Sequence, residues 1–344
     1  MGDPEVDFRS WKEPGVFAAG EGVFRIPLPI PDVGLHAVNI YIIENDDGPV
    51  LIDSGQAMTK ARDTLESALK EIGYSFTDIS AFVLTHVHRD HYTHAIELRR
   101  EFGTKIYAGA GERPNLDRIR DPNYDRYGSQ LDLLRQSGAP GLAALNTGLS
   151  DGIEPDLWEY PDEWLSDGDA VRMTSRTLRI VETPGHTRGH IVGFDEARHV
   201  IFSGDHVLPH ITPSLGFEPD VPERPLGDYL TSLNRLLEFD DARVLPAHGP
   251  IVESLHERVC ELLKHHDDRL NSTLGRVSHQ PVSPADVAAK LSWTRRGRSF
   301  TELGPIDQML AILETKAHLD VLADDGSLVR RIGCQAEITF SSTG

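Results

Sequence analysis

Short apolar runs alternate with longer amphipathic segments over the first 255 residues of the chain. Apolar residues at positions 61, 65, 68, 69 and 72 share one face of a 3.6-residue period, which predicts a helix over residues 58–72. Runs rich in Val, Ile and Tyr predict strands. The expected strands are residues 24–27, 36–44, 49–53, 81–85, 105–108, 178–183, 190–194, 199–202 and 243–245, with further helices at 96–102 and 226–239. Strands interleaved with helices predict a layered α/β (α+β) domain over residues 1–255.

One stretch inside this domain breaks the pattern. Residues 109–166 carry few strand signals but contain Trp158, Tyr160 and Trp164. The stretch is too long for a plain loop in a compact domain, so it predicts a partly helical functional insertion, a lid or a wall of a substrate site. The three aromatic residues either line an apolar pocket or anchor the insertion to the core, and the pattern leaves both interpretations open.

The segment after residue 255 has a different pattern. Residues 257–274 read as a helix, Ser283 and Pro284 open a second one that ends at residue 291, and residues 306–322 form a third. A turn and a short strand at 328–332 follow. This order is typical of a small winged-helix module, predicted over 256–335, with a tail at 336–344. We expect His318 to pack inside, and His265 and His266 to face solvent.

The composition narrows the possible partners. The formal net charge is −20, and such an acidic chain is a poor binder of nucleic acid or of an anionic membrane. Two cysteines, Cys260 and Cys334, cannot form a disulfide framework and are expected to be inert thiols in a reducing compartment. The chain lacks an 18-residue apolar run, a signal-peptide pattern and a myristoylation pattern, so we expect a cytoplasmic protein without a membrane segment.

The densest chemical signal is the run THVHRDH. His86, His88, Asp90 and His91 place four potential metal ligands within six residues, between a short apolar strand and a helix. Residues two apart in an extended segment project to the same side, and the start of a helix can turn back toward the same point. Imidazole and carboxylate ligands suit Zn²⁺, Fe or Mn²⁺ rather than Ca²⁺. The run therefore predicts a transition-metal site.

Three more candidate ligands follow predicted strands. They are His186 after LRIVE, Asp205 after HVIF and His248 after ARVL. Each alone is compatible with an ordinary turn. Loops that leave strand ends are held by a rigid scaffold, so together these residues predict one preorganised site.

The motifs HxHxDH, PGHT, SGD and PAHG, with the earlier Asp53-Ser54-Gly55, resemble the metallo-β-lactamase superfamily over about residues 20 to 255. The helical tail and the phrase GDHVLP are similar to its lactamase-β-2-like and glyoxalase II-like branch. The resemblance implies an αββα sandwich with two divalent metal ions, Zn²⁺ first and Fe or Mn²⁺ as alternatives. It implies that one ion binds His86, His88 and His186, that the other binds Asp90, His91 and His248, and that Asp205 bridges them. Asp53 and His190 would support the ligands from behind.

Such a pair of cations implies hydrolysis. Metal coordination lowers the pKa of bound water to about 7, which provides a hydroxide nucleophile at neutral pH. Asp205 would hold the pair, and Asp90 or the bound water would carry the proton to the leaving group. We expect a small acyl substrate, a thioester or ester, with a lactone as a further case. His206 and His210 are candidate substrate contacts because they lie on the expected active-site loop around Asp205, and Tyr92 is a third because it directly follows His91.

Two other activities fit the same motifs. A metal-dependent endoribonuclease or phosphodiesterase is disfavoured by the net charge, although the winged-helix-like tail and the cluster of Arg295, Arg296 and Arg298 favour it mildly. An iron-dependent redox enzyme of the same fold is the other alternative, but the tail lacks a glycine-rich loop for a flavin phosphate. Because of the net charge of −20, nucleic acid is not the expected partner. A homodimer is the default assembly.

Overall fold

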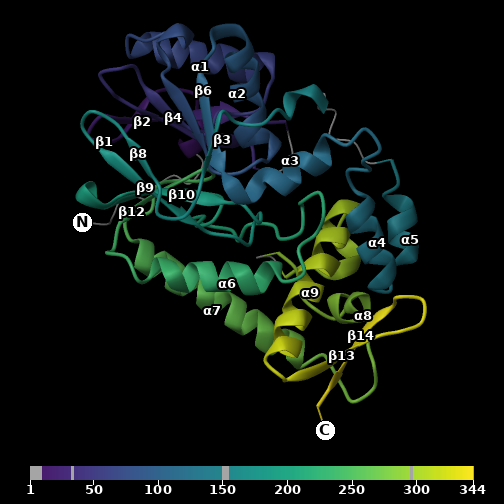
Figure 1. Ribbon diagram of the computed structural model, residues 1–344. Coiled ribbons are helices and arrows are strands. Elements are labelled where there is room, and N and C mark those ends of the chain that lie inside the picture. Colours follow the sequence, from purple (N-terminus) through teal and green to yellow (C-terminus); the bar gives the residue numbers. More distant parts are fainter. Residues whose placement is uncertain (1–9, 32–34, 149–154, 295–296, 344) are drawn as a thin grey trace.

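The computed structural model describes residues 10–31, 35–148, 155–294 and 297–343. Two β-sheets lie face to face, and helices cover the outer face of each (Figure 1). Helices α1 and α2 pack on the first sheet, and α6 and α7 pack on the second. A separate apolar cluster fills the space between the sheets. The four layers are the αββα sandwich that the sequence motifs implied.

The first sheet has seven strands in the order β1 to β7, and the second has five in the order β12-β11-β10-β9-β8. Strands β1 to β4 are antiparallel, whereas β4 to β7 are parallel. In the second sheet, β11 and β12 are the parallel pair. The strands are β1 Phe17–Gly20, β2 Val23–Pro29, β3 Ala37–Ile43, β4 Val50–Ile52, β5 Ala81–Leu84, β6 Lys105–Gly109, β7 Glu163–Leu165, β8 Ala170–Arg172, β9 Thr177–Glu182, β10 Ile191–Asp195, β11 Val200–Gly204 and β12 Arg243–Pro246.

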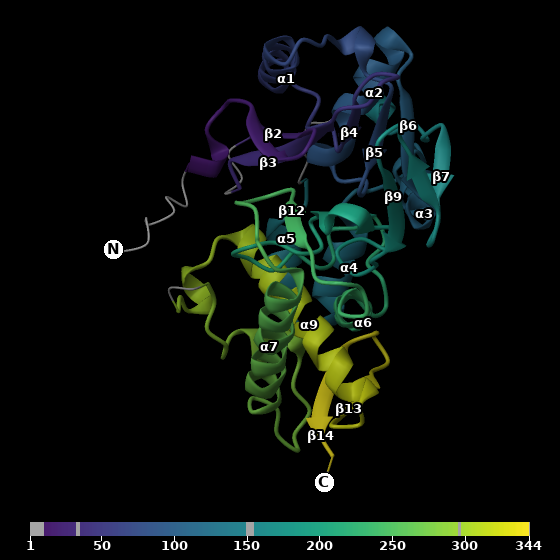
Figure 2. The ribbon, with the colours of Figure 1, turned by 90° about the vertical axis from the view of Figure 1, so that its left-hand side faces the viewer.

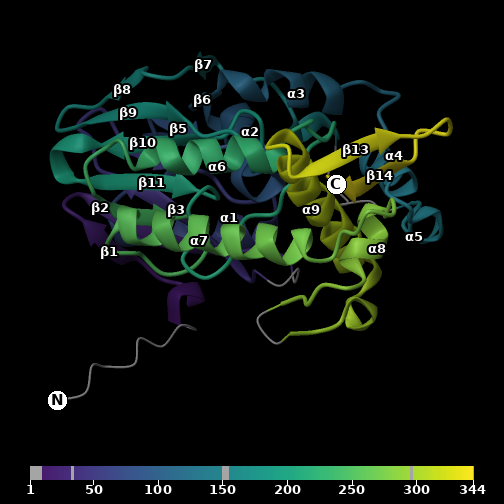
Figure 3. The same cartoon turned by 90° about the horizontal axis from the view of Figure 1, so that it is seen from below.

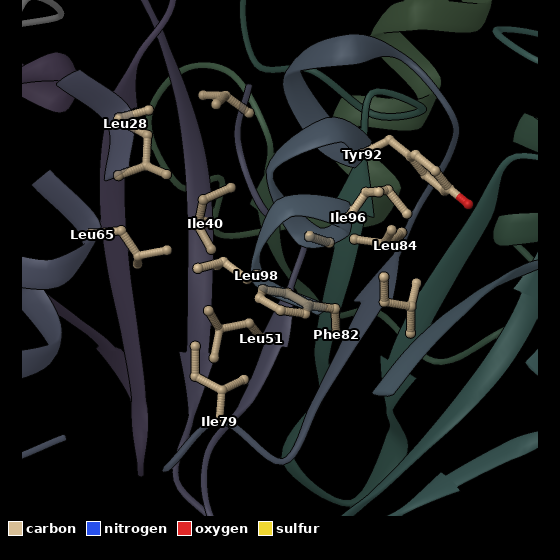
Figure 4. Packing of buried hydrophobic residues seen from close by; sticks show 14 of the residues in the cluster. Leu28, Ile40, Leu51, Leu65, Ile79, Phe82, Leu84, Tyr92, Ile96 and Leu98 are labelled. Carbon is tan, nitrogen blue, oxygen red and sulfur yellow. The ribbon is translucent and has the colours of Figure 1, made fainter. Parts of the chain in front are cut away.

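Strand β3 shows why the apolar runs of the chain form these layers. All seven of its residues are buried. Alternate side chains of a strand point to opposite faces. Tyr41 and Ile43 therefore join the core between the sheets, whereas Ile40 and Ile42 join the core beneath α1 and α2. Figure 4 shows this outer core, with Leu65 of α1 and Leu98 of α2 packed on the strands. A strand buried on both faces appears in the sequence as a continuous apolar run.

The helices confirm most of the sequence prediction but shift several boundaries, that of α2 most of all. They are α1 Thr59–Glu71, α2 Arg89–Phe102, α3 Arg113–Ile119, α4 Gly128–Gln136, α5 Pro140–Leu145, α6 Pro225–Leu236, α7 Leu255–Leu274, α8 Pro284–Ala288 and α9 Pro305–Asp324. Helix α2 begins seven residues before the predicted start at Ile96. Its first turn carries polar residues that face the candidate site, so that turn lacks an amphipathic pattern. None of the helices in the described ranges has both the length and the apolar character needed to cross a bilayer.

The insertion at 109–166 is partly helical, as predicted, and it has two different neighbours. Its aromatic residue Trp158 is buried in the core beneath α2, where it stacks on Tyr92 with a ring-centroid distance of 6.1 Å. Helices α4 and α5 instead pack against α9 in a second core (Figure 3). Trp158 is therefore an anchor rather than a pocket residue. The insertion connects the sandwich to the C-terminal segment.

The C-terminal segment consists of α7, α8 and α9 followed by a two-stranded hairpin (Figure 2). The hairpin strands are β13, Leu328–Ile332, and β14, Ile338–Ser342, which pair antiparallel. Strand β14 lies in the residues expected to be a tail, and buried Ile338 and Phe340 join the core of this segment. Its short alternation was too weak to be recognised in the sequence. Arg295 and Arg296 of the basic cluster lie outside the described residues.

Two expectations for histidines of this segment had different outcomes. His318 is buried in α9, as expected. His265 is exposed, but His266 is buried against His318 with a ring-centroid distance of 5.4 Å. The expectation of a solvated His266 was therefore wrong, because α9 covers that face of α7. Cys260 and Cys334 are exposed free thiols.

Candidate metal centre

The candidate ligands lie where strands of the two sheets end. His86 and His88 follow β5, and Asp90 and His91 occupy the first turn of α2. The other three lie just past strands of the second sheet: His186 after β9, Asp205 after β11 and His248 after β12. These strands place seven side chains from four segments at the same edge of the sandwich.

The seven side chains form three overlapping groups, each able to hold a metal ion. One group contains His86, His88 and His186, and another contains Asp90, His91 and His248. Within each group the potential ligand atoms lie within 4.8 Å of one another. Asp205 joins a third group with His86 and His91. The structure thus brings together every residue for which the sequence motifs implied a metal-binding role.

Asp205 lies between the two outer groups. Its Oδ2 is 3.5 Å from Nε2 of His186, which belongs to the first group. Its Oδ1 is 3.7 Å from Nε2 of His91 and 3.4 Å from Nε2 of His248, which belong to the second. The two oxygens of one carboxylate therefore face two different sets of histidines. This is the arrangement expected of a ligand shared by two cations.

The orientation of three ligand rings is fixed from behind. Nδ1 of His186 donates to the carbonyl oxygen of Ser214 over 2.7 Å, and Nδ1 of His248 donates to that of Ala37 over 2.8 Å. A carbonyl can only accept, so in both rings Nε2 keeps its lone pair toward the site. Nδ1 of His91 likewise lies 2.8 Å from Oδ2 of Asp53. Such contacts fix the tautomer of a metal ligand and increase its basicity.

Asp53 is itself held firmly. Its Oδ1 accepts from the backbone N–H of Thr85 over 2.8 Å, and the Thr85 hydroxyl lies 3.0 Å from both carboxylate oxygens. The side chain is buried beneath the ligand histidines. The structure thus places Asp53 behind a ligand ring, the position that the resemblance implied.

His190 supports the backbone of Asp205. Its Nε2 accepts the N–H of Asp205 over 3.2 Å, while its Nδ1 lies 2.8 Å from the Thr183 hydroxyl. The preceding Gly204 has φ of 50°, and a Cβ there would lie 2.7 Å from Nε2 of His190 and 2.7 Å from Cβ of Thr85. The close approach of Gly204 to His190 allows this hydrogen bond and sets the direction of the Asp205 side chain.

The donor set fits metal ions. Buried Nε2 atoms of His86, His91 and His248, and Oδ1 of Asp205, have no hydrogen-bond partner among the described residues. Buried polar atoms are normally satisfied, so their convergence on one point calls for a ligand. The seven side chains supply imidazole nitrogen and carboxylate oxygen, which suit Zn²⁺, Fe and Mn²⁺. The residues present therefore fit the cations that the fold implies.

The electrostatics of the site agree with this fit. Burial lowers the pKa of His86 and His88 far below its usual value, and neighbouring histidines lower it further, so both rings are neutral. Burial also lowers the pKa of His91, but the carboxylates of Asp53, Asp90 and Asp205 outweigh it and raise that pKa to about 10. Three carboxylates around one ring are an excess of negative charge that a divalent cation would neutralise.

The predicted substrate contacts are not supported by the structure. Tyr92 is buried, and its hydroxyl donates to the carbonyl oxygen of Glu159 over 2.6 Å. His206 is buried between His190 and Tyr229, with ring-centroid distances of 5.8 Å and 4.9 Å. Neither these two nor His210 is among the residues that line the cavity beside the ligands. A residue next to a ligand in the sequence can therefore point its side chain away from the site.

The cavity beside the ligands has a volume of about 480 Å³. It is bounded by the candidate metal site, by the insertion and by α9 of the C-terminal segment. The lining residues outside the ligands include Ile119, Tyr124, Tyr127, Phe217, Glu218, Asn115, Ile306, Met309 and Leu310. The sequence pattern predicted a wall from the insertion but identified none of these residues individually. They belong to no motif, and only tertiary packing brings them together.

Comparisons with known proteins agree with the geometry. A sequence profile described as the Metallo-beta-lactamase superfamily matches residues 33–248. The chain is 25% identical over 326 residues to the probable metallo-hydrolase YqjP of Bacillus subtilis, covering 88% of this chain and 92% of that protein. It is 24% identical over 296 residues to the atrochrysone carboxyl ACP thioesterase AgnL7 of Paecilomyces divaricatus, covering 83% and 77%. It is 26% identical over 270 residues to the lactamase-like protein adaB of Aspergillus niger, covering 78% and 67%.

Solved structures extend the likeness beyond residue 248. A metallo-beta-lactamase family protein from Thermus thermophilus superposes with a TM-score of 0.75 at 26% identity, covering 94% of this chain and 99% of that one. A beta-lactamase domain protein from Burkholderia ambifaria gives 0.74 at 26% identity, covering 95% of both chains. The profile, the relatives and the fold thus point the same way, and the chain belongs to the metallo-beta-lactamase superfamily.

Proposed function

We propose that this protein is a dinuclear metal-dependent hydrolase that acts on a small acyl substrate, a thioester or an ester. The observation that carries the proposal is the position of Asp205, whose two carboxylate oxygens face His186 on one side and His91 with His248 on the other. One group of three ligands lies on each side. Zn²⁺ is the cation we expect, with Fe and Mn²⁺ as alternatives.

Bound cations would supply ionised water at neutral pH and polarise the carbonyl group under attack. The side chains of the protein orient the groups that would bind these cations. Asp53 orients His91, and His190 orients the Asp205 backbone. Asp90 lines the cavity, with its Oδ2 3.5 Å from Nε2 of His248. Burial raises the pKa of Asp90, but His91 and His248 lower it more, to about 2. The carboxylate is therefore charged at neutral pH, and we assign to it the transient relay of a proton from the attacking water to the leaving group.

The shape of the cavity supports an acyl substrate. Ile119, Phe217 and Leu310 of α9 give the cavity an apolar lining. Apolar walls with a few placed polar groups are typical of small-molecule sites. One relative is named a thioesterase of an acyl carrier protein, which agrees in bond type with the first choice of substrate.

A panel of substrates tests the proposal. The protein is loaded separately with Zn²⁺, Mn²⁺ and Fe²⁺, and assayed on acyl-CoA thioesters, aryl esters, lactones and single-stranded RNA. We expect thioester or ester hydrolysis that disappears in Asp205→Asn and persists in His265→Ala, whose site is exposed on α7. Cleavage of RNA alone, or oxygen consumption alone in the iron form, would replace the proposal with the nuclease or the redox enzyme.

A further inference from the structure

Two glutamates outside the metal ligands are buried side by side, and one of them, Glu218, lines the cavity. Glu112 ends the short 3-10 helix Ala110–Glu112 at the start of the insertion, and Glu218 lies between β11 and α6. They are 0% and 1% exposed. Nδ2 of Asn115 donates to both, over 2.7 Å to Oε2 of Glu112 and 2.8 Å to Oε2 of Glu218. One amide group thus bridges two carboxyl groups.

The same pair anchors the loop that carries His186. The hydroxyl of Thr187 is hydrogen-bonded to Oε1 of Glu112, and Nε of Arg188 donates to Oε2 of Glu218 over 3.0 Å. A Cβ on Gly189 would lie 2.0 Å from the backbone nitrogen of Glu112, so the loop and the start of the insertion are in direct contact. The two residues that follow the ligand are therefore both fixed by the carboxyl pair.

The charges around the pair balance only when one proton is present. Arg188 is the cation in contact with Glu218, and its Nη2 also donates to the carbonyl oxygen of Asp220. The Asp220 carboxylate pairs with Arg118 instead. Tyr92 of α2 is a further titratable neighbour, and the Glu112 carboxylate raises the pKa of its hydroxyl after the larger effect of burial. Two buried carboxylates and one guanidinium leave a net negative charge, which is costly away from water.

The pKa values point in the same direction. Burial raises the pKa of Glu112, and the neighbouring Glu218 raises it further, to about 8. Burial also raises the pKa of Glu218, which Asn115 and Arg188 counteract. Two carboxyl groups so close to one another titrate as a pair, and the first proton stays bound through neutral pH.

We propose that Glu112 and Glu218 are positioning residues that share one proton and thereby hold His186 where it can bind a metal ion. Thr187 donates to Glu112, Arg188 donates to Glu218 and Asn115 donates to both, so the shared proton neutralises the one negative charge that Arg188 leaves uncompensated. When the proton leaves, two buried negative charges remain beside the single guanidinium of Arg188, and their repulsion separates the insertion from the His186 loop. The contribution of the pair to metal affinity therefore falls as the pH rises through about 8. The inference rests on the proposed metal site, but its readout is metal retention rather than turnover.

Glutamine substitutions test the shared proton, since glutamine resembles a glutamate that keeps its proton. Zinc affinity is measured by competition with a chromophoric chelator in wild-type protein, Glu112→Gln, Glu218→Gln and the control Glu314→Gln. Glu314 is a half-buried carboxyl on α9 that lies 3.8 Å from Arg269. Raising the pH also removes the proton of His91, which increases the affinity of every variant, so the readout is the ratio between variants. Between about pH 7 and about pH 9.5 we expect the affinity of Glu112→Gln to gain about 10- to 100-fold on that of wild type and of the control, the range seen when contacts behind a ligand are removed.

Several outcomes decide the matter. Identical pH profiles for wild type and a folded Glu112→Gln protein would overturn the proposal, and Glu218→Gln repeats the test if circular dichroism shows that the first variant is unfolded. An alkaline change in the affinity of Glu112→Gln equal to that of the control would also overturn it. Failure of the proposed hydrolysis would leave these affinities measurable, whereas a wild-type protein without zinc affinity at neutral pH would remove both proposals together.

Discussion

The histidines at the strand ends and the pair His266–His318 are both buried, yet their surroundings are opposite. At the strand ends, ring nitrogens converge on Asp90 and Asp205, and the backbone or Asp53 takes the other nitrogen. Between α7 and α9, Nδ1 of His266 lies 3.3 Å from Nε2 of His318, and the neighbours that lower the pKa of both rings are Arg269 and His265. Several histidines close together therefore do not by themselves make a metal site. A metal site also needs ring nitrogens that converge on one point and carboxylates that balance the charge of the cation.

The largest effect should come from the residue that distinguishes the two clusters. Asp205→Asn keeps the size of the side chain but removes the negative charge that faces His186 on one side and His91 with His248 on the other. We expect loss of at least one metal equivalent and turnover below detection, with an unchanged circular dichroism spectrum. Elemental analysis of purified protein and the ester assay measure this. Full metal content with wild-type turnover would show that the carboxylate is not shared. His318→Leu in the other cluster is the matched control, which should keep its metal.

A smaller loss of metal affinity is expected for Asp53, which lies behind the ligand His91. Asp53→Asn keeps the positive φ of 60° that asparagine tolerates, but weakens the acceptor for Nδ1 of His91. Loss of such a contact typically lowers metal affinity or activity by about 10- to 100-fold. Chelator competition and kcat/KM measure both. An affinity within twofold of wild type would mean that Asp53 serves only the Thr85 turn.

The pair His266–His318 should instead appear in the pH dependence of stability. Burial lowers the pKa of His318 to about 4, and its neighbours Arg269 and His265 also lower it. The unfolded chain, with a histidine pKa near 6.5, takes up the proton first as the pH falls, so stability is complete above about pH 6.5 and decreases below it. His318 accounts for about 2 kcal/mol between pH 7.5 and pH 5.

Urea unfolding at those two pH values measures this contribution. His318→Phe should have a smaller difference between the two conditions than wild type, whereas the exposed His265→Phe should resemble wild type. If the difference in unfolding free energy between the two pH values is equal in all three proteins, the pKa of His318 is not lowered by folding.

The smallest effect is expected at Tyr92. Tyr92→Phe removes the hydrogen bond to the carbonyl oxygen of Glu159 and leaves the stacking on Trp158. We expect about 1 kcal/mol of lost stability with kcat and KM unchanged, because the ring does not line the cavity. A changed KM would return Tyr92 to the substrate contacts.

The sequence predicted the parts of this protein that are encoded locally. The strand at residues 36–44 was recognisable because its side chains are buried on both faces. The ligands of THVHRDH were recognisable because all four lie within six residues. The cavity wall was not predicted residue by residue. Asn115, Glu218 and Met309 lie in three segments without a shared motif, and they meet only after α9 packs on the insertion.

The errors have the same cause. His206 follows Asp205 directly, but the turn at Gly204 sends the two side chains in different directions, one to the ligands and one toward Tyr229. His266 was expected in solvent because α7 alone gives no sign of the helix that covers it. Local pattern identifies which residues are chemically special. Tertiary packing decides which way they face.

Helix α9 contributes Ile306, Met309 and Leu310 to the cavity while supplying none of the metal-binding groups. Substitutions along this helix can therefore reshape what the pocket admits without disturbing the reaction centre. The C-terminal segment thus adds to the cavity wall separately from the residues that can bind metal. Related proteins can therefore differ in the substrates that fit this cavity through substitutions in α9, while the metal-binding residues stay the same.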